Sequence, residues 1–317
     1  MTEIVSDDLV LPFRLGRAAT RGRLVRLGPA VDRVLAQHDY PDPVSQLLGE
    51  LLALGAVLST TLKYDGFFTL QTRSEGAVRL MVADITSGGE MRGYANIDAD
   101  AYAEVVAQAG GEVPSVPRLL GGGHLAFTVD QGPDTERYQG IVALEGESLA
   151  ACAHNYFQQS EQIDTGIVLA CDQVGDNWRA GALMLQRMPT DGGTTDDEDE
   201  FGAVTDMPGD TDGEDEDWHR AMILMSSVTP AEMLDPTLPA ADLAYRLFHE
   251  EHVRGYSARE MRFGCRCSRS RITRTLQGLP QAEVRDMLED GKIEVTCQFC
   301  NSSETFDEQA LDVLFTA

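Results

Sequence analysis

The sequence predicts an α+β protein with an N-terminal core domain of mixed helices and antiparallel sheet, a helical linker and a small C-terminal module. Three observations predict this organisation. Short β-rich runs and apolar helical patterns share the first 190 residues, in an order that favours antiparallel strands over a doubly wound parallel sheet. A strongly acidic stretch begins at Asp191. Four of the six cysteines form two tight pairs near the C-terminus.

The core domain is expected over residues 1–190, and hydrophobic periodicity assigns its elements. Arg21–Gln37 places apolar residues at roughly helical spacing, and after a turn at Tyr40–Pro43 the apolar window Leu47–Leu62 predicts a buried helix. That window carries Glu50 and is shorter than the roughly 20 apolar residues of a bilayer span. Strands are expected at Gly66–Thr72, Val78–Asp84, Met91–Ile97, His124–Asp130, Tyr138–Ala143, Ile163–Leu169 and Ala180–Leu185, with a helix at Glu147–Gln159.

Composition limits the classes of partner. The chain has 317 residues, 52 acidic against 25 basic side chains and a net charge of −27 at pH 7. Such a surface repels both a phosphate backbone and an anionic membrane, so neither nucleic acid nor membrane is an expected partner. The N-terminal stretch is acidic before it is apolar and lacks the basic region of a targeting signal, so a cytoplasmic location is expected.

The acidic stretch Asp191–Asp217 holds 13 acidic side chains, no basic ones and five glycines in 27 residues. It cannot bury enough apolar surface to offset the entropy of ordering, so we predict a disordered acidic insert. Two interpretations stay open: a solvated linker, or an acidic tether that keeps the protein soluble or engages basic partners.

Helical patterns return in residues 218–263, where Thr229-Pro230-Ala-Glu marks a helix start. This segment is rich in charge and only moderately apolar, so it shows no core of its own and must pack on a neighbour. We therefore predict a metastable helical linker.

Residues 264–317 are built around Cys265-Arg-Cys267 and, after 29 intervening residues, Cys297-Gln-Phe-Cys300. Four thiolates in two close pairs suit a tetrahedral Zn²⁺ site, with each pair supplying adjacent corners. We predict one zinc ion per chain, bound by Cys265, Cys267, Cys297 and Cys300. So short a module, with few large apolar residues, would take most of its folding free energy from the metal.

The same spacings permit redox chemistry, because neighbouring thiols are the nearest oxidation partners if the metal leaves. Cys297 and Cys300 can close the familiar ring with a two-residue spacer, whereas Cys265 and Cys267 can close only a smaller, more strained ring. Nearby arginines would favour thiolate over thiol, unless they form only a solvated face or a phosphate-binding patch. These arginines are Arg262, Arg266, Arg269 and Arg271.

Other candidate features are weaker. Gly121-Gly-Gly-His124 lacks the Gly-Lys-Ser/Thr of a phosphate loop and suits the approach to a hairpin. Cys152 and Cys171 stand in apolar surroundings and are expected to be buried rather than reactive. His249 and His252 flank two glutamates, a pattern that could place metal ligands on one helix face. No hydrolase or metalloprotease motif occurs, so no catalytic residue is predicted and the protein is not expected to be an enzyme.

The cysteine spacing, at the end of an acidic chain, resembles that of the redox-regulated chaperone family called heat-shock protein 33, or Hsp33. The resemblance extends to segments across most of the chain, namely Arg21–Arg26, His38–Pro41, Val78–Asp84, Met91–Tyr94, Tyr156–Ile163, Leu185–Pro189 and His249–Glu251. Two departures stand out. Gly181-Ala182 replaces the usual Gly-Gly, and the acidic insert is longer than is typical of the family.

The resemblance implies a cytoplasmic holdase chaperone that does not hydrolyse ATP. In the reduced state the four cysteines would hold Zn²⁺ and the protein would be inactive. Peroxide or hypochlorite, with unfolding heat, would form the disulfides Cys265–Cys267 and Cys297–Cys300 and release zinc, so residues 264–317 would be a redox switch. The linker would then unfold, the chain would form a homodimer, and the core domain would bind unfolding client proteins.

Two other function classes remain open. A zinc-ribbon nucleic-acid-binding protein would use the arginines near the cysteines, although the acidic background and the Cys-x-Cys spacing count against it. A thiol-disulfide oxidoreductase would need Cys-x-x-Cys at a helix N-terminus after a strand, with one thiol of low pKa.

Overall fold

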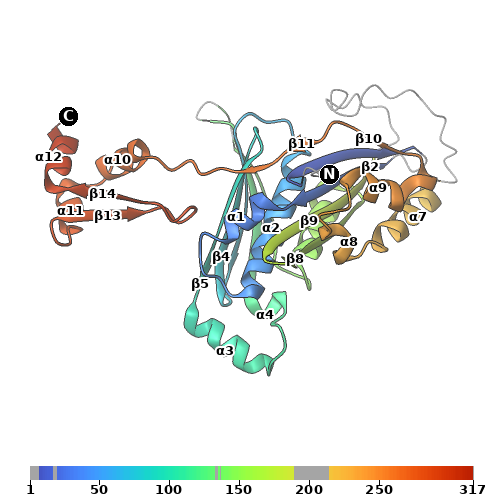
Figure 1. Ribbon diagram of the computed structural model, residues 1–317, viewed down its shortest axis with the longest axis horizontal. Coiled ribbons are helices and arrows are strands. Elements are labelled where there is room, and N and C mark those ends of the chain that lie inside the picture. The colour runs from blue at the N-terminus through green and yellow to red at the C-terminus, as the bar shows by residue number, and fades with distance from the viewer. Residues whose placement is uncertain (1–6, 17–19, 133–134, 136, 189–213, 317) are drawn as a thin grey trace. The chain divides into compact units, whose positions relative to one another are not determined.

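The computed structural model describes residues 7–16, 20–132, 135, 137–188 and 214–316 (Figure 1). The chain divides into two compact units, Met1–Phe263 and Gly264–Ala317. The larger unit contains two sheets of six strands each, with helices between and around them, and the smaller contains a two-stranded hairpin and helices. Mixed helices and largely antiparallel sheets confirm the predicted α+β class.

Sheet A is antiparallel and has the strand order β10-β1-β2-β9-β8, with β11 also paired to β1. Its strands are β1 (Leu9–Leu15), β2 (Thr20–Leu27), β8 (Thr165–Val174), β9 (Asn177–Arg187), β10 (Val253–Gly255) and β11 (Arg259–Glu260). Most residues of the central strands β2 and β9 are buried, because helices cover both faces of this sheet.

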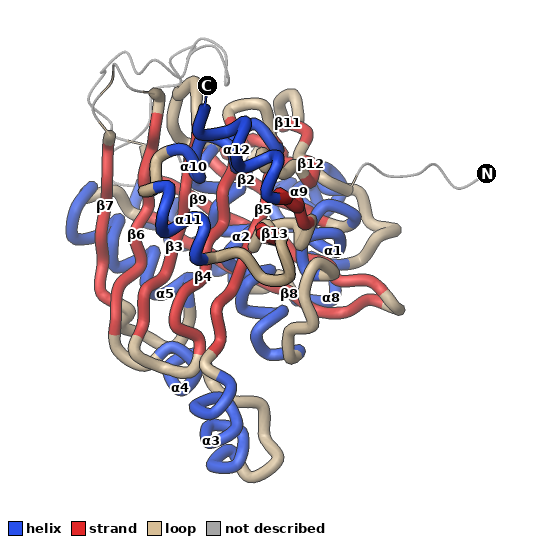
Figure 2. The backbone as a smooth tube through the Cα atoms, turned by 90° about the vertical axis from the view of Figure 1, so that its left-hand side faces the viewer, coloured by secondary structure: helices blue, strands red, loops and turns tan. Residues whose placement is uncertain are grey.

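Sheet B has the order β12-β5-β4-β3-β6-β7, and its long strands lie side by side in Figure 2. Its strands are β3 (Phe67–Ser74), β4 (Val78–Thr86), β5 (Glu90–Ile97), β6 (Gly123–Asp130), β7 (Tyr138–Ala143) and β12 (Arg262–Phe263). Among the described strands, only β12 and β5 pair in parallel. Phe68, Leu70 and Thr72 of β3 are buried and alternate with more exposed residues, so one face of this sheet packs inward.

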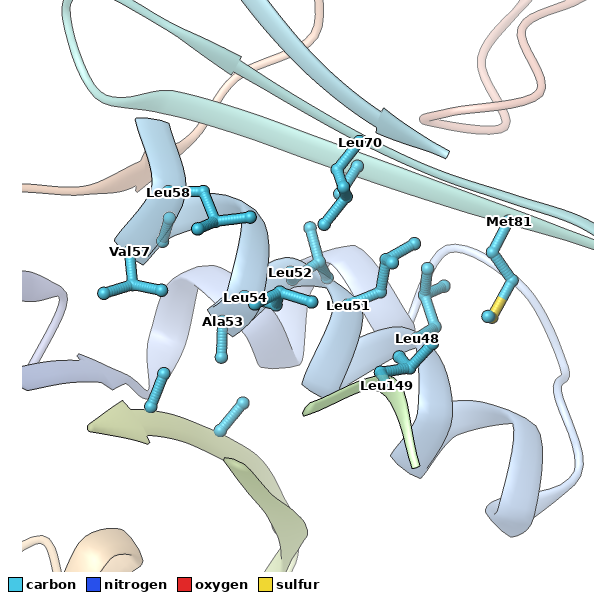
Figure 3. Close-up of a cluster of buried hydrophobic side chains, with 14 of the residues drawn as sticks. Leu48, Leu51, Leu52, Ala53, Leu54, Val57, Leu58, Leu70, Met81 and Leu149 are labelled. Atoms are coloured by element: carbon cyan, nitrogen blue, oxygen red, sulfur yellow. The ribbon is translucent and has the colours of Figure 1, made fainter. Parts of the chain in front are cut away.

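Helix α2 (Asp42–Ser59) forms the centre of the larger unit and packs against both sheets (Figure 3). Fourteen of its 18 residues are buried. Two glycines allow the close approach of each layer. A Cβ at Gly49 would lie 2.3 Å from Cys171 Sγ in sheet A, and one at Gly55 would lie 2.8 Å from Ile85 Cδ1 in sheet B. The buried helix predicted from Leu47–Leu62 is therefore correct, and it begins earlier.

Shorter helices surround this core. They are α1 (Pro29–Leu35), α3 (Ala99–Ala109), α4 (Val116–Leu120), α5 (Leu149–Tyr156) and the π-helical turn η1 (Phe157–Glu161). The Asp8 carboxylate caps the N-terminus of helix α1. It accepts hydrogen bonds from the backbone amides of Gly28 at 2.8 Å and Ala30 at 3.0 Å. None of the described helices is both long enough and apolar enough to cross a bilayer.

A second core lies on the other face of sheet A, beneath a layer of three helices. These are α7 (Glu214–Ser226), α8 (Pro230–Leu234) and α9 (Ala240–Phe248). Alternation along β1 serves both cores, because Val10 belongs to the core around α2 whereas Phe13 packs beneath the helices. The Phe13 ring stacks on Phe248 at 5.5 Å between centroids. Residues 218–263, which we call the linker segment, therefore bury their apolar side chains against sheet A rather than in a core of their own.

The helix predicted over Arg21–Gln37 is wrong in its first half, because β2 is a strand and α1 begins only at Pro29. Both faces of β2 are covered, so its residues lack the alternation of a half-buried strand and imitate a helical pattern. The helix start at Thr229 is confirmed. The Thr229 hydroxyl accepts from the Glu232 amide at 3.3 Å, and the Glu232 carboxylate accepts from the Thr229 amide at 3.0 Å.

The predicted disordered insert, Asp191–Asp217, lies outside the described residues except for its last four. For those four the prediction is wrong, because α7 begins at Glu214. Asp215 contacts the Arg187 guanidinium at 2.7 Å, and acidic side chains in the first turn of a helix are stabilised by its dipole.

In the smaller unit, helices and one hairpin enclose a small core. The elements are α10 (Arg269–Gln277), α11 (Gln281–Asp286), β13 (Lys292–Thr296), β14 (Ser303–Asp307) and α12 (Glu308–Thr316). The buried core is Leu276, Val284, Ile293, Phe306, Leu311 and Leu314. Arg269 joins α10 to the hairpin, because its guanidinium lies 4.3 Å from the Phe306 ring centroid and 2.8 Å from the Glu304 carboxylate.

Candidate functional site

The structure brings the four cysteines of the C-terminal pairs together, with all four sulfurs within 4.8 Å of one another. Two of the contacts cross between the pairs. Cys265 Sγ lies 3.7 Å from Cys297 Sγ, and Cys267 Sγ lies 3.3 Å from Cys300 Sγ. Within the described part of the chain, no other group of three or more histidine, cysteine or carboxylate side chains meets this spacing.

A tight turn between β13 and β14 positions the second cysteine pair. Cys297 donates its backbone amide to the Ser302 carbonyl at 2.8 Å, and Asn301 donates to the Cys297 carbonyl at 2.8 Å. Asn301 has a φ of 53°, a left-handed conformation that asparagine tolerates better than most residues. The hairpin therefore presents both thiols from one short loop.

The first cysteine pair lies in the segment between β12 and α10. Ser268 caps α10, because its hydroxyl accepts a hydrogen bond from the Arg271 amide at 3.3 Å. The cap fixes the point at which the chain leaves Cys267 and enters the helix. Helix α10 in turn packs on the small core through Leu276, so that core holds both thiol-bearing segments.

Ser302 contacts the sulfurs directly. Its Oγ lies 3.1 Å from Cys300 Sγ and 3.5 Å from Cys267 Sγ. Burial opposes a thiolate at Cys300, but hydrogen bonds from Ser302 and the neighbouring thiols outweigh burial and lower its pKa to about 6. At Cys267 the Ser302 hydrogen bond is outweighed by burial and by the other thiols, and the pKa is raised to about 12. The cluster thus favours a thiolate at Cys300, and a bound cation would displace protons from other thiols.

The arginines near the first pair do not act as predicted. The Arg262 guanidinium lies 2.9 Å from the Glu90 carboxylate, and Arg269 pairs with Glu304. The expectation that arginines hold this pair as thiolates is wrong at Cys267, whose pKa is raised. Each of these two arginines thus has a carboxylate partner, which weakens its effect on the thiols.

The four thiols fit a soft, tetrahedral metal ion. Zn–S bonds of about 2.3 Å in a tetrahedron place the sulfurs about 3.8 Å apart. The contacts of 3.3 and 3.7 Å across the pairs come close to this separation. Four sulfur donors with no carboxylate among them favour zinc over magnesium or calcium.

The remaining sequence candidates lie elsewhere. Cys152 and Cys171 are buried beside α2, and burial raises the pKa of both thiols. His249 begins a short 3₁₀ turn that ends at His252, which has a φ of 53°, so the two histidines do not share one face of an α-helix. Glu251 between them is buried and pairs with Arg220 at 2.5 Å.

Sequence analysis missed the groups that join the linker segment to sheet A. Arg26 of β2 is 1% exposed and donates hydrogen bonds to the backbone carbonyls of Asp235 and Leu238. Arg179 of β9 is 7% exposed and donates to the Leu234 carbonyl at 2.6 Å. Leu234 is the last residue of α8, and Asp235 and Leu238 lie in the turn that leads to α9.

One carboxylate completes this arginine network, which we define as Arg26, Arg179 and Asp7. Asp7 contacts Arg179 and lies 3.6 Å from Arg26. The available signal was the presence of arginines within otherwise apolar strands, since buried arginines are rare unless they are paired.

Comparisons with known proteins agree on one family. A family model described as Hsp33 protein matches residues 8–307. The 33 kDa chaperonin of Caulobacter vibrioides is 41% identical over 304 residues, covering 94% of each chain. The 33 kDa chaperonin of Escherichia coli is 34% identical over 299 residues, covering 93% of this chain and 90% of the relative. The crystal structure of the Hsp33 homologue of Thermotoga maritima shares the fold, with a TM-score of 0.79, 23% identity and 98% of each chain covered.

Proposed function

The chain belongs to the Hsp33 family, and from that premise we propose that it is a redox-regulated holdase chaperone. With its thiols reduced, it would bind one Zn²⁺ through Cys265, Cys267, Cys297 and Cys300 and be inactive. Oxidation to Cys265–Cys267 and Cys297–Cys300 disulfides would expose a surface that binds unfolding proteins without ATP. The observation that carries the proposal is the cluster of four thiols within 4.8 Å. We also propose a cytoplasmic location and a homodimer in the oxidised state.

The oxidation step balances with peroxide as the oxidant. Each pair of thiols gives up two electrons and two protons to form one disulfide, and one hydrogen peroxide is reduced to two waters. Two peroxide molecules would therefore oxidise both pairs of one chain. A disulfide sulfur is a poor metal ligand compared with a thiolate, so both pairs lose their affinity for zinc when they oxidise.

Loss of zinc would unfold the smaller unit, because its apolar core is small. That core contains six buried residues, so metal binding is expected to supply much of its folding free energy. The proposed disulfides close only very short loops, which restrict the unfolded chain little. Residues 264–317 therefore form the proposed redox switch.

The proposed client-binding surface is the face of sheet A beneath the linker segment. Its buried residues include Leu11, Phe13, Leu15, Leu24, Leu183 and Leu185. Removal of α7, α8 and α9 would uncover a continuous apolar surface of the kind that binds exposed hydrophobic segments. The apolar faces of the released helices would add to it.

The linker segment has features of a marginally stable element. Its strands β10, β11 and β12 contain three, two and two residues, so few ladder hydrogen bonds hold them. Cys265 follows Phe263 by two positions, so β12 ends next to the proposed switch. Unfolding of the switch would leave this short strand at the end of the ordered chain, where fraying begins.

The test compares reduced, zinc-loaded protein with peroxide-treated protein in a light-scattering assay on a thermally unfolding client such as citrate synthase. We expect suppression of aggregation only after oxidation, together with loss of zinc and of four free thiols per chain. A Cys152→Ala variant, which keeps the cluster, should behave like the unaltered protein. Equal activity in both states would overturn the redox switch. Catalysed insulin reduction or a salt-dependent gel shift would instead support an oxidoreductase or a nucleic-acid-binding protein.

A further inference from the structure

A cavity of about 260 Å³ lies in the larger unit, at the C-terminal end of α2. It is lined by residues of β2 and β9 from sheet A, of β3, β6 and β7 from sheet B, and of α5 and η1. The segment Tyr156–Ile163, which the sequence singled out, supplies several lining residues. The function proposed for the thiol cluster and the linker segment gives Tyr156–Ile163 no role.

One side of the cavity is cationic. Arg21 and Arg23 lie two residues apart on β2, so both side chains point to the same face of sheet A. Arg23 is 3% exposed, and its Nη2 donates to the Thr60 carbonyl at 3.0 Å. Gln186 stands opposite Arg21 in the strand register and adds an amide to the same wall. The wall thus presents several N–H groups, of which the Arg23 Nη2 and the Gln186 amide also donate to Thr60 and Thr165.

The opposite side is aromatic and closely packed. Phe127 meets the Tyr156 ring edge-on at 4.7 Å between centroids and stacks on Phe68 at 6.0 Å. Gly140 lies opposite Phe127 on β7, and a Cβ at that glycine would lie 2.2 Å from Phe127 Cζ. The Phe127 ring can occupy this position only because residue 140 has no side chain. Close packing therefore fixes the aromatic wall.

A π-helical turn forms the rim. η1 ends at Glu161, and the next residue, Gln162, has a φ of 55°. Such turns are rare and frequently occur at functional sites. This one positions the Glu161 carboxylate to accept hydrogen bonds from the hydroxyls of Tyr138 at 2.8 Å and Tyr156 at 2.5 Å. Glu161 is exposed, so its charge is screened by solvent as well as bound by two donors.

We propose that this cavity is a binding site for a small apolar carboxylate. The carboxylate would meet the guanidinium groups of Arg21 and Arg23, whose planar donors match its two oxygens. The apolar body, best an aromatic ring, would lie against Phe68 and Phe127. The volume is below the roughly 300–1,000 Å³ of clefts for drug-sized ligands, so the ligand is smaller than these. This site is independent of the redox chemistry proposed above.

The experiment uses calorimetric titration of full-length, reduced, zinc-loaded protein with phenylpropionate and with its neutral analogue phenylpropanol. The acid should bind at least about tenfold more tightly than the alcohol, because only the acid can pair with guanidinium. Arg21→Met should weaken binding of the acid by at least about tenfold. The matched control Arg79→Met removes a half-exposed arginine of β4 that pairs with Asp98, and it should bind as before.

A second variant keeps the proposal testable if Arg21→Met does not fold. Leu62 lines the cavity and is 39% exposed, so Leu62→Trp can fill the space without disturbing a buried position. This variant should lose the phenylpropionate site while it keeps its zinc. The proposal is overturned if the unaltered protein binds no phenylpropionate, if the alcohol binds equally well, or if binding survives Leu62→Trp.

Discussion

At the scale of single residues, the arginine network makes the position of the linker segment depend on polar geometry. A buried guanidinium is costly unless it is hydrogen-bonded and paired with a carboxylate. Arg26 and Arg179 meet that requirement only while the carbonyls at the end of α8 and in the following turn lie on sheet A. Once the helix leaves, both cations face an apolar surface with Asp7 as their remaining partner. The network therefore favours a specific docked position more than it adds stability.

Replacing Arg179 by Met should loosen the linker segment in the reduced protein. The change leaves the Leu234 carbonyl and Asp7 short of a partner, and breaking a buried pair in this way costs about 3 kcal/mol. We expect faster hydrogen exchange in α8 and α9 and measurable suppression of client aggregation without oxidant. Arg246→Met, which removes a 43%-exposed partner of Glu232, is the control and should change neither. Unchanged exchange in Arg179→Met would show that the network does not hold the linker.

Glu50 gives the larger unit a pH-dependent stability. Burial within α2 raises its pKa from 4.5 to about 7, so the folded protein retains a proton that the unfolded chain releases. The free energy of unfolding should therefore fall by about 3 kcal/mol as pH rises from about 4.5 to about 7. Glu50→Gln mimics the protonated carboxyl and should be about 3 kcal/mol more stable than the unaltered protein at pH 8 but equal below pH 4.5.

Denaturant titrations across this pH range measure the difference. Glu104→Gln, at an exposed position of α3, should follow the unaltered protein throughout. A constant difference between Glu50→Gln and the unaltered protein at every pH would show that folding does not raise the pKa of Glu50.

At the scale of elements, alternation of buried and exposed residues made strands easier to predict. The five longer strands of sheet B were placed from sequence to within a few residues, because one face is covered and residues alternate along them. Strands β1 and β2 were missed, since helices cover both faces and alternation disappears, although β9 was located as a short apolar run. Thr229 shows the converse case, because a capping box acts locally and needs no tertiary information.

Removing that cap should destabilise α8 by about 1 kcal/mol. In Thr229→Ala the amide of Glu232 loses its acceptor at the start of the helix, so α8 amides should exchange faster while zinc content stays the same. Ser226→Ala removes a hydroxyl that only bonds back to the Ile223 carbonyl, and it should leave exchange in α8 unchanged. Equal exchange in both variants would mean that packing alone holds α8.

At the scale of the whole molecule, the two units should respond separately to metal loss. Chelating the proposed zinc from the reduced protein should remove about 10 kcal/mol or more from the folding of the smaller unit, so its amides should lose protection. Amides of α2 and of the central strands should stay protected, because the core of the larger unit contains no ligand. Cys297→Ser should reproduce the effect and Cys152→Ala should not. Full zinc retention in Cys297→Ser would contradict the four-thiolate site.

The sequence alone was enough to select the four cysteines as a candidate metal site, because the spacing of the two pairs is characteristic. It could not show which sulfurs touch, since those contacts depend on how the hairpin meets the chain before α10. It also could not show that Arg262 and Arg269 pair with Glu90 and Glu304, because these partners lie far from them in the chain. The cavity was invisible for the same reason, as its walls come from strands of both sheets.

The compactness of the sulfur cluster gives every thiol more than one possible disulfide partner, because all four sulfurs lie within 4.8 Å of one another. A bond across the pairs would join Cys265 to Cys297 or Cys267 to Cys300, positions 32 and 33 apart in the chain. Such a bond would link the hairpin covalently to the segment before α10 and keep the module closed. The proposed bonds within each pair leave these two segments free to separate. The set of disulfides that forms first would therefore decide whether oxidation opens the module or traps it in a closed, inactive form.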